Sequence, residues 1–144
     1  MAELKRPHPA DDVLSRPFWE AARRGELVVQ RCSACRIWQH PPASTCHRCN
    51  SGAQLSFQPV SGAARLFSWT VVHQSLIAGF EEAVPYVNLL VELDEQPGLL
   101  MLSDTASLGM PDWPLNTGAR MRVWFEHGEP DVVLPQFRPA GETP

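Results

Sequence analysis

The four cysteines of this 144-residue chain stand in two pairs, and each pair has two residues between its members. Cys32 pairs with Cys35 and Cys46 with Cys49, and ten residues separate the two pairs. Two C-x2-C turns at this separation present four thiolates to one point, as a tetrahedral metal site requires. We therefore expect the first third of the chain to be stabilised by a bound metal ion.

This ligand set favours zinc, and iron in a rubredoxin-type site of the same geometry is the alternative. Protein ligands would fill all four positions, which leaves none for water or substrate, so we expect a structural rather than a catalytic ion. The chain has no further cysteine to serve as a nucleophile, and it has no G-x-S-x-G motif. The sequence therefore names no catalytic residue.

The composition of the chain disfavours several classes of protein. A formal net charge of -4 disfavours a general nucleic-acid binder, which usually carries a basic excess. The 14 prolines favour short strands joined by rigid loops. No apolar run approaches the ~18 residues of a membrane helix, and the first residues lack the apolar segment of a secretory signal. We expect a cytoplasmic protein whose cysteines bind metal rather than form disulfides.

Residues 1–25 are expected to form a tail and one short helix. Pro17 suits the first turn of that helix, and Gly25 suits its end. Phe18 and Trp19 give the helix an apolar side, which either packs on the body of this chain or docks on a partner subunit. We take these two residues as a candidate partner interface. Residues 26–53 follow as a rubredoxin-like zinc ribbon, whose core is too small to fold without metal.

From residue 54 onward, apolar and polar residues alternate. Period-two alternation predicts five strands, which we expect over residues 63–73, 85–93, 99–103, 120–126 and 132–137. Five strands with a central hairpin and a long connection suit a small Greek-key barrel of the OB type, and a β-sandwich is the alternative. The expected fold is mainly β: an N-terminal helix and a rubredoxin-like zinc ribbon, then a five-stranded OB-fold barrel with a C-terminal tail over residues 54–144.

Several stretches together resemble a known family: Phe18–Trp19, GELVVQRCSAC, HPPASTCHRCNS, VSGAARLFSWTVVH, VPYVNLLVELDEQPGLLMLSD, NTGARMRVWFE and LPQFRPA. In this order and spacing they resemble the zinc-ribbon plus OB-fold proteins long catalogued as a domain of unknown function and associated with acyl-CoA metabolism. The family pattern usually has glycine after the second cysteine of each knuckle. This chain has Arg36 and Asn50 there, so we expect a less regular first knuckle.

The resemblance implies an accessory role. Family members commonly act as small subunits of thiolase-like enzymes and of the related aldolases that shorten steroid side chains, and the large subunit holds the catalytic residues. For this chain it implies no catalysis alone and a hetero-oligomer with a thiolase-like or aldolase large subunit. The chain would stabilise that subunit and help to form its acyl-CoA site, in lipid metabolism or steroid degradation.

A site for coenzyme A needs cations for the phosphates and an apolar groove for the pantetheine and acyl parts. Arg31 and Arg48 lie near the cysteines and Arg65 opens the first barrel strand, so these three are candidate CoA-binding residues. The alternative function is a free-standing CoA- or acyl-CoA-binding module. A third is an OB protein that binds single-stranded nucleic acid, and the acidic charge and the single lysine, Lys5, disfavour it.

Overall fold

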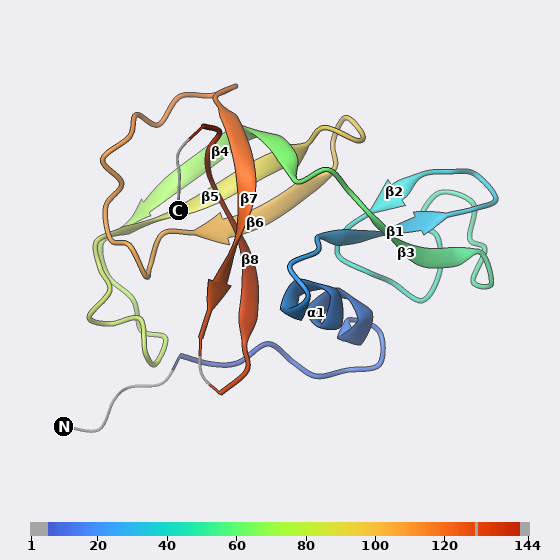
Figure 1. The fold of residues 1–144 in the computed structure, drawn as a ribbon, viewed down its shortest axis with the longest axis horizontal. Coiled ribbons are helices and arrows are strands. Elements are labelled where there is room, and N and C mark those ends of the chain that lie inside the picture. The colour runs from blue at the N-terminus through green and yellow to red at the C-terminus, as the bar shows by residue number, and fades with distance from the viewer. Residues whose placement is uncertain (1–5, 129, 142–144) are drawn as a thin grey trace.

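The computed structural model describes residues 6–128 and 130–141, and within these ranges the chain forms one helix and two antiparallel sheets (Figure 1). The first sheet has three strands in the order β2-β1-β3, and the second has five in the order β6-β5-β4-β7-β8. The three-stranded ribbon lies at one end of the five-stranded barrel (Figure 1). The expectation of a mainly β fold with a ribbon and a five-stranded barrel is confirmed.

Helix α1 (Arg16–Arg23) begins after Ser15, whose backbone N–H donates to Oδ1 of Asp12 at 2.7 Å. The helix ends before Gly25, which takes a left-handed conformation with φ of 75°. Its buried side consists of Phe18, Ala21 and Ala22. This side packs on a ribbon strand, β1, and on a barrel strand, β8. The helix therefore bridges the two sheets.

The ribbon sheet is built from β1 (Val28–Cys32), β2 (Trp38–Gln39) and β3 (Leu55–Pro59). β3 pairs with β1 along its whole length, with Val28 opposite Pro59. The sheet of the ribbon thus extends to Pro59, whereas the sequence places the change from ribbon to barrel between residues 53 and 54. Alternation indicates that a segment is a strand, but it does not indicate which sheet the strand joins.

Five strands make the barrel: β4 (Ala63–Val72), β5 (Tyr86–Leu93), β6 (Leu100–Asp104), β7 (Arg120–His127) and β8 (Val133–Pro139). Hydrogen bonds through Ser103 and Gln136 connect the outer strands β6 and β8. Ser103 Oγ donates to Gln136 Oε1 at 2.7 Å and accepts from the backbone N–H of Phe137 at 2.9 Å. These bonds join the two edges of the sheet, which therefore curls into a nearly closed barrel.

One apolar core serves all three parts of the chain. Leu66, Leu89 and Phe137 are among the largest fully buried side chains of the barrel. Phe18 from the helix and Trp38 from the ribbon belong to the same cluster. The ribbon is too small to bury enough apolar surface by itself, so its packing on the barrel supplies burial that its own three strands lack.

Replacing Gly62, which precedes β4, with alanine should lower the free energy of unfolding by about 2–4 kcal/mol. Gly62 has a φ of 79°, and a Cβ there would press against Cγ1 of Val123. Gly98→Ala is the matched control, since Gly98 has the same φ and an added Cβ would meet nothing within 4 Å. It should lose only about 1–2 kcal/mol for its backbone. Denaturant unfolding measures both, and equal losses would contradict the predicted clash.

Candidate functional site

The four cysteines converge on one point. Their Sγ atoms all lie within 4.8 Å of one another, with 3.6 Å between Cys32 and Cys49 and 3.5 Å between Cys35 and Cys46. A tetrahedral zinc ion with Zn–S distances of about 2.3 Å sets its sulfur atoms about 3.8 Å apart. The four cysteines are therefore positioned to bind a metal ion, and an S4 set is the ligand set of a structural zinc site.

The backbone of each knuckle favours thiolates. The backbone N–H of Cys35 lowers the pKa of Cys32, and the N–H groups of Cys49 and Arg48 lower the pKa of Cys46 to about 6. Hydrogen bonds to the charged form of a thiol favour that form. The backbone N–H of Ser51 acts in the same direction on Cys49, but burial and hydrogen bonds with the other three thiols raise the pKa of Cys49 to about 11. A thiolate is the form that binds metal, so it is the backbone of the knuckles, and not the contacts among the thiols, that favours metal ligands.

Arg36 and Asn50, which follow the two knuckles, both adopt the left-handed conformation, with φ of 64° and 60°. They occupy the places where the family pattern has glycine, and the conformation that glycine would favour is retained. Arg36 bears this conformation at some energetic cost because it carries a Cβ. Its carbonyl accepts a hydrogen bond from Nε of Arg31 at 3.1 Å, which helps to hold the first knuckle.

A buried pair of glutamines supports the connection that leads into the second knuckle. Gln39 Nε2 donates to Gln30 Oε1 at 2.6 Å, and Gln39 Oε1 accepts from the backbone N–H of His47 at 3.1 Å. Gln30 also donates to and accepts from the backbone of Ala43, at 2.9 Å each. Nothing in the sequence analysis singled out these glutamines. Two glutamines on short strands that also carry valine and tryptophan were the available signal, since buried amides must find partners.

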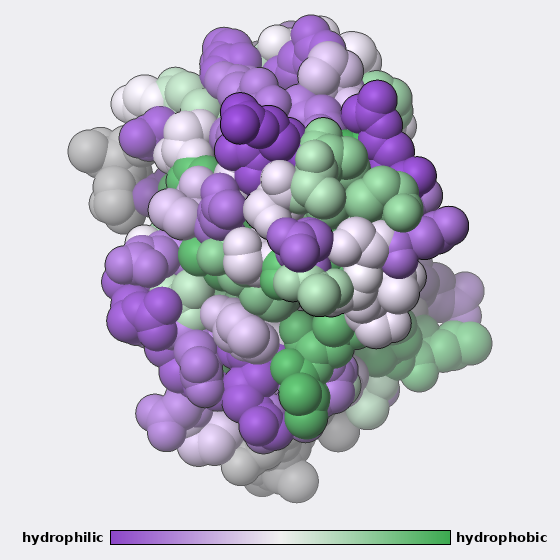
Figure 2. Space-filling view, turned by 90° about the vertical axis from the view of Figure 1, so that its right-hand side faces the viewer, coloured by the Kyte–Doolittle hydropathy of each residue, from purple (hydrophilic) through white to green (hydrophobic). Residues whose placement is uncertain are grey.

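The structure places the three candidate CoA arginines on separate elements. Arg31 lies over the ring of Trp38 at 4.7 Å, and Arg48 is exposed in the second knuckle. Arg65 donates from Nε to Oε1 of Glu92 at 2.6 Å. Hydrophilic side chains cover much of the ribbon-side face (Figure 2). None of the three arginines lines the groove described next, and their CoA role stays a prediction.

Phe18 and Trp19 have different environments. Phe18 is 7% exposed and belongs to the chain's own core, and its ring meets that of Trp19 edge-on with 4.8 Å between centroids. Trp19 is only partly buried. The docking role of this pair stays a prediction, and Trp19 rather than Phe18 offers surface for it.

A groove of about 720 Å³ lies between the helix, the ribbon and the outer side of the barrel. Its lining is mainly apolar and includes Phe18 and Trp19, Pro41 and Pro42, and Leu90, Leu100, Leu102 and Leu134. Asn88, Asp104 and Gln136 add polar atoms at the barrel wall. At the ribbon wall His40 lies beside Phe18, with 5.6 Å between ring centroids, and burial lowers the pKa of this histidine.

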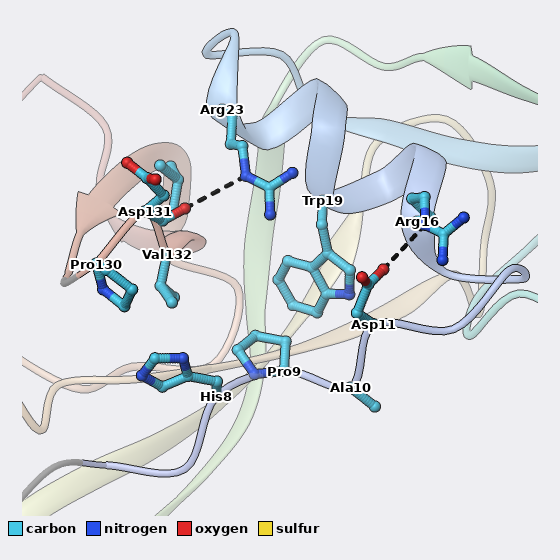
Figure 3. A pocket seen from close by; sticks show the side chains of 11 residues that line it. His8, Pro9, Ala10, Asp11, Arg16, Trp19, Arg23, Pro130, Asp131 and Val132 are labelled. Carbon is cyan, nitrogen blue, oxygen red and sulfur yellow. Dashed lines mark hydrogen bonds and ion pairs between the residues drawn. The ribbon is translucent and has the colours of Figure 1, made fainter.

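A smaller recess of about 200 Å³ adjoins the groove, and Trp19 and Ala10 line both. In Figure 3 Trp19 stands between Arg16 and Arg23 on the helix. His8 and Pro9 lie across from the helix on the N-terminal segment. Arg16 Nε donates to Asp11 Oδ1 at 2.9 Å, and Arg23 Nε donates to the carbonyl of Asp131 at 3.3 Å. The recess therefore adds two guanidinium groups beside an apolar groove.

Among the described residues, no helix is both long and apolar enough to cross a membrane.

Two family models match the chain. A model of the rubredoxin-like zinc ribbon domain of ChsH2 matches residues 19–56, and a model of the C-terminal OB-fold domain of ChsH2 matches residues 57–126. The chain is also similar to a chain in the solved structure of an Ltp2-ChsH2(DUF35) aldolase, with 32% identity and a TM-score of 0.75. That match covers 92% of this chain and 99% of the other.

Two further relatives are longer than the part they share with this chain. A protein of Thermomonospora curvata described as a probable enoyl-CoA hydratase alpha subunit is 34% identical over 140 residues, which is 94% of this chain and 40% of that protein. A protein of Methanocaldococcus jannaschii described as a DUF35 domain-containing scaffold protein is 27% identical over 85 residues, which is 59% of this chain and 60% of that protein.

Metal analysis of the purified chain should find about one zinc per chain, since four thiolates complete one tetrahedral site. Cys46→Ser should lose the ion and become sensitive to proteolysis in its first third, because metal binding supplies folding energy to so small a ribbon. Arg36→Gly is the matched control, since it alters a knuckle, keeps all four thiols and relieves the positive φ. A fully folded wild-type chain without metal would contradict the prediction.

Proposed function

This chain belongs to the ChsH2 family of DUF35 proteins, which combine a zinc ribbon with an OB fold, and from that premise we propose that it is a non-catalytic accessory subunit of an acyl-CoA-processing enzyme of thiolase-like or aldolase type. The observation that carries the proposal is its similarity to a chain of the Ltp2-ChsH2(DUF35) aldolase over 92% of this chain. The large subunit would hold the catalytic residues. The small chain would stabilise it and help to form its acyl-CoA site.

The chemistry of the chain supports a role without catalysis of its own. Its four thiols converge on one metal position, so they are not available as nucleophiles. The relative described as a probable enoyl-CoA hydratase alpha subunit supports a partner that acts on acyl-CoA thioesters. We place this activity in the cytoplasm, where thiols stay reduced, and in lipid or steroid breakdown.

The groove and the recess together fit the two halves of an acyl-CoA. The groove has a volume of about 720 Å³, within the range of about 300–1,000 Å³ that is typical of small-molecule sites. Its apolar walls suit an acyl and pantetheine chain. Arg16 and Arg23 offer guanidinium groups to phosphates, which would replace Asp11 and the carbonyl of Asp131 as their partners. Arg16 and Arg23 lie beside the apolar groove, so one acyl-CoA could contact the groove and these guanidinium groups together. Arg31, Arg48 and Arg65 line neither cavity.

The alternative is a free-standing acyl-CoA-binding module, which would use the same groove. The oligomeric state of the chain distinguishes this module from an accessory subunit.

A single-stranded nucleic-acid binder is a weaker candidate. Phe67 and Trp69 are exposed on the barrel, but residues 66–119 contain no lysine or arginine. Stacking on these rings would therefore lack the cationic track that follows a phosphate backbone.

The tagged full chain, expressed in its own host, should be isolated as a hetero-oligomer with a larger acyl-CoA-processing subunit. Native mass spectrometry measures the composition, and assays for thiolase, aldolase and hydratase turnover measure activity. The isolated chain should show no turnover, because the catalytic residues belong to its partner. A monomer in its own host, or turnover that survives removal of the partner, would overturn the accessory role.

Arg23→Ala should weaken the binding of a long-chain acyl-CoA by about tenfold, as expected for the loss of one charge-assisted contact. Quenching of tryptophan fluorescence or titration calorimetry measures the affinity. Arg48→Ala is the matched control, since Arg48 is an exposed arginine away from both cavities. Loss of affinity in Arg48→Ala with none in Arg23→Ala would move the CoA site to the ribbon.

A further inference from the structure

Nine large apolar side chains are exposed among the described residues, and six of them lie on β4 or in the β4–β5 and β6–β7 connections. One lies at the middle of β4, one lies in its second half, and four lie in these two connections. Figure 1 shows both connections at the end of the barrel opposite the ribbon. The six form what we call the barrel-end patch: Phe67, Trp69, Leu76, Ile77, Leu108 and Met110.

The β4–β5 connection is held by its own contacts, yet it points two aliphatic side chains outward. The backbone N–H of Phe80 donates to the carbonyl of Ile77 at 3.0 Å, and the ring of Phe80 packs on Tyr86 with 5.9 Å between centroids. Leu76 is nevertheless 89% exposed and Ile77 55% exposed. A surface already fixed in this way loses little conformational entropy when a partner covers it.

The β6–β7 connection is fixed in a similar way. The backbone N–H groups of Leu108 and Gly109 both donate to the carbonyl of Thr105 at 2.8 Å, and Thr105 Oγ1 donates to the carbonyl of Gly109 at 2.7 Å. This turn leaves Leu108 59% exposed and Met110 47% exposed. Both connections therefore present apolar side chains on ordered backbone.

β7 pairs with β4 only at its start, and the residues just before β7 extend this contact to Leu66 through hydrogen bonds with Gly118 and Ala119. β4 pairs with β5 through Val72, but its register with β7 ends at Arg65. Beyond that point Phe67 is 46% exposed and Trp69 is 37% exposed. Two exposed aromatic side chains on one strand add apolar surface that another chain can cover.

Most of the charge in the two connections that carry the patch is negative. No lysine or arginine occurs from residue 66 through residue 119. The exposed carboxylates of Glu81, Glu82 and Asp112 lie in the same two connections as the patch. Arg6 of the N-terminal segment lies over Phe80 at 4.8 Å, and its ion pair with Glu126 at 3.6 Å offsets its charge. The barrel end is therefore apolar with an acidic rim.

We propose that the barrel-end patch is the surface on which the large enzyme subunit docks, and that the large subunit meets it with an apolar area bordered by lysine and arginine. This inference rests on the accessory role proposed above. An apolar centre inside a charged rim is the usual composition of a protein interface, and opposite charges on the two rims speed and orient association. The acidic rim would repel the phosphates of acyl-CoA, so within the shared acyl-CoA site these phosphates would lie toward the helix arginines rather than toward the rim.

The same charges argue against two other occupants. A second copy that docked through the same patch in a two-fold dimer would bring the two acidic rims face to face, which costs free energy. A lipid surface with anionic headgroups would be repelled in the same way. The large subunit is the occupant whose surface can carry the positive charge that complements the acidic rim of the patch.

The test uses the full chain and the large subunit that co-purifies with it from its own host. Leu76→Arg should weaken the complex at least about tenfold, because a charge enters the apolar centre. Glu81→Lys combined with Glu82→Lys should slow association about tenfold and reduce its dependence on salt. Val13→Arg is the matched control, since Val13 is 82% exposed but lies on the N-terminal segment. Biolayer interferometry measures rates and affinity, and circular dichroism confirms that each variant is folded.

Loss of binding in the two barrel-end variants with full binding in Val13→Arg would support the proposal. Full binding in all variants would overturn the docking surface and leave the accessory role intact. Absence of any large subunit with the wild-type chain would overturn the accessory role itself. If the wild type forms concentration-dependent dimers that Leu76→Arg abolishes, the occupant of the patch is a second copy and not the large subunit. If the wild type binds phosphatidylcholine vesicles and Leu76→Arg abolishes that binding, the occupant is a membrane.

Discussion

The convergence of four thiolates on one metal position is the constraint on which the rest of the molecule depends. The ribbon has three strands of five, two and five residues, which is too little structure to fold by apolar burial alone. The metal fixes the two knuckles, and between them run Trp38 and the segment His40–Pro42. This segment forms one wall of the groove. The shape of the groove therefore depends on metal ligands that do not line it.

The ribbon holds a fixed place on the barrel through a few specific contacts. Gln96, in the turn between β5 and β6, accepts from the backbone N–H of Trp38 and donates to its carbonyl, at 3.0 Å each. The amide thus pairs with the ribbon strand much as a neighbouring strand would. Arg31 covers the ring of Trp38 from the other strand of the ribbon. With Phe18 packed in the same core, helix, ribbon and barrel have a defined arrangement.

Local patterns in the sequence predicted much of this fold, because cysteine spacing and period-two alternation are properties of neighbouring residues. The metal ligands and the five barrel strands follow from them to within about two residues. Long-range choices were not predictable in this way. The pairing of β3 with β1 and the bond from Arg65 to Glu92 join residues that no local pattern relates. The groove was missed for the same reason, since its walls come from five separate segments.

The two ion pairs of the barrel explain why its far end is acidic. Arg65 and Arg120 border the stretch without lysine or arginine, and they pair with Glu92 and Asp94 on β5 and just after it. The Gly98 backbone N–H and then Arg65 lower the pKa of Glu92, so this carboxylate stays charged and paired. These ion pairs neutralise Arg65 and Arg120 near the ribbon. The carboxylates in the β4–β5 and β6–β7 connections, at the other end of the barrel, keep their charge. Residues 66–119 hold seven carboxylates and no lysine or arginine, so most of the negative charge of the chain belongs to the barrel. At the helix, by contrast, carboxylates such as Asp11 alternate with arginines.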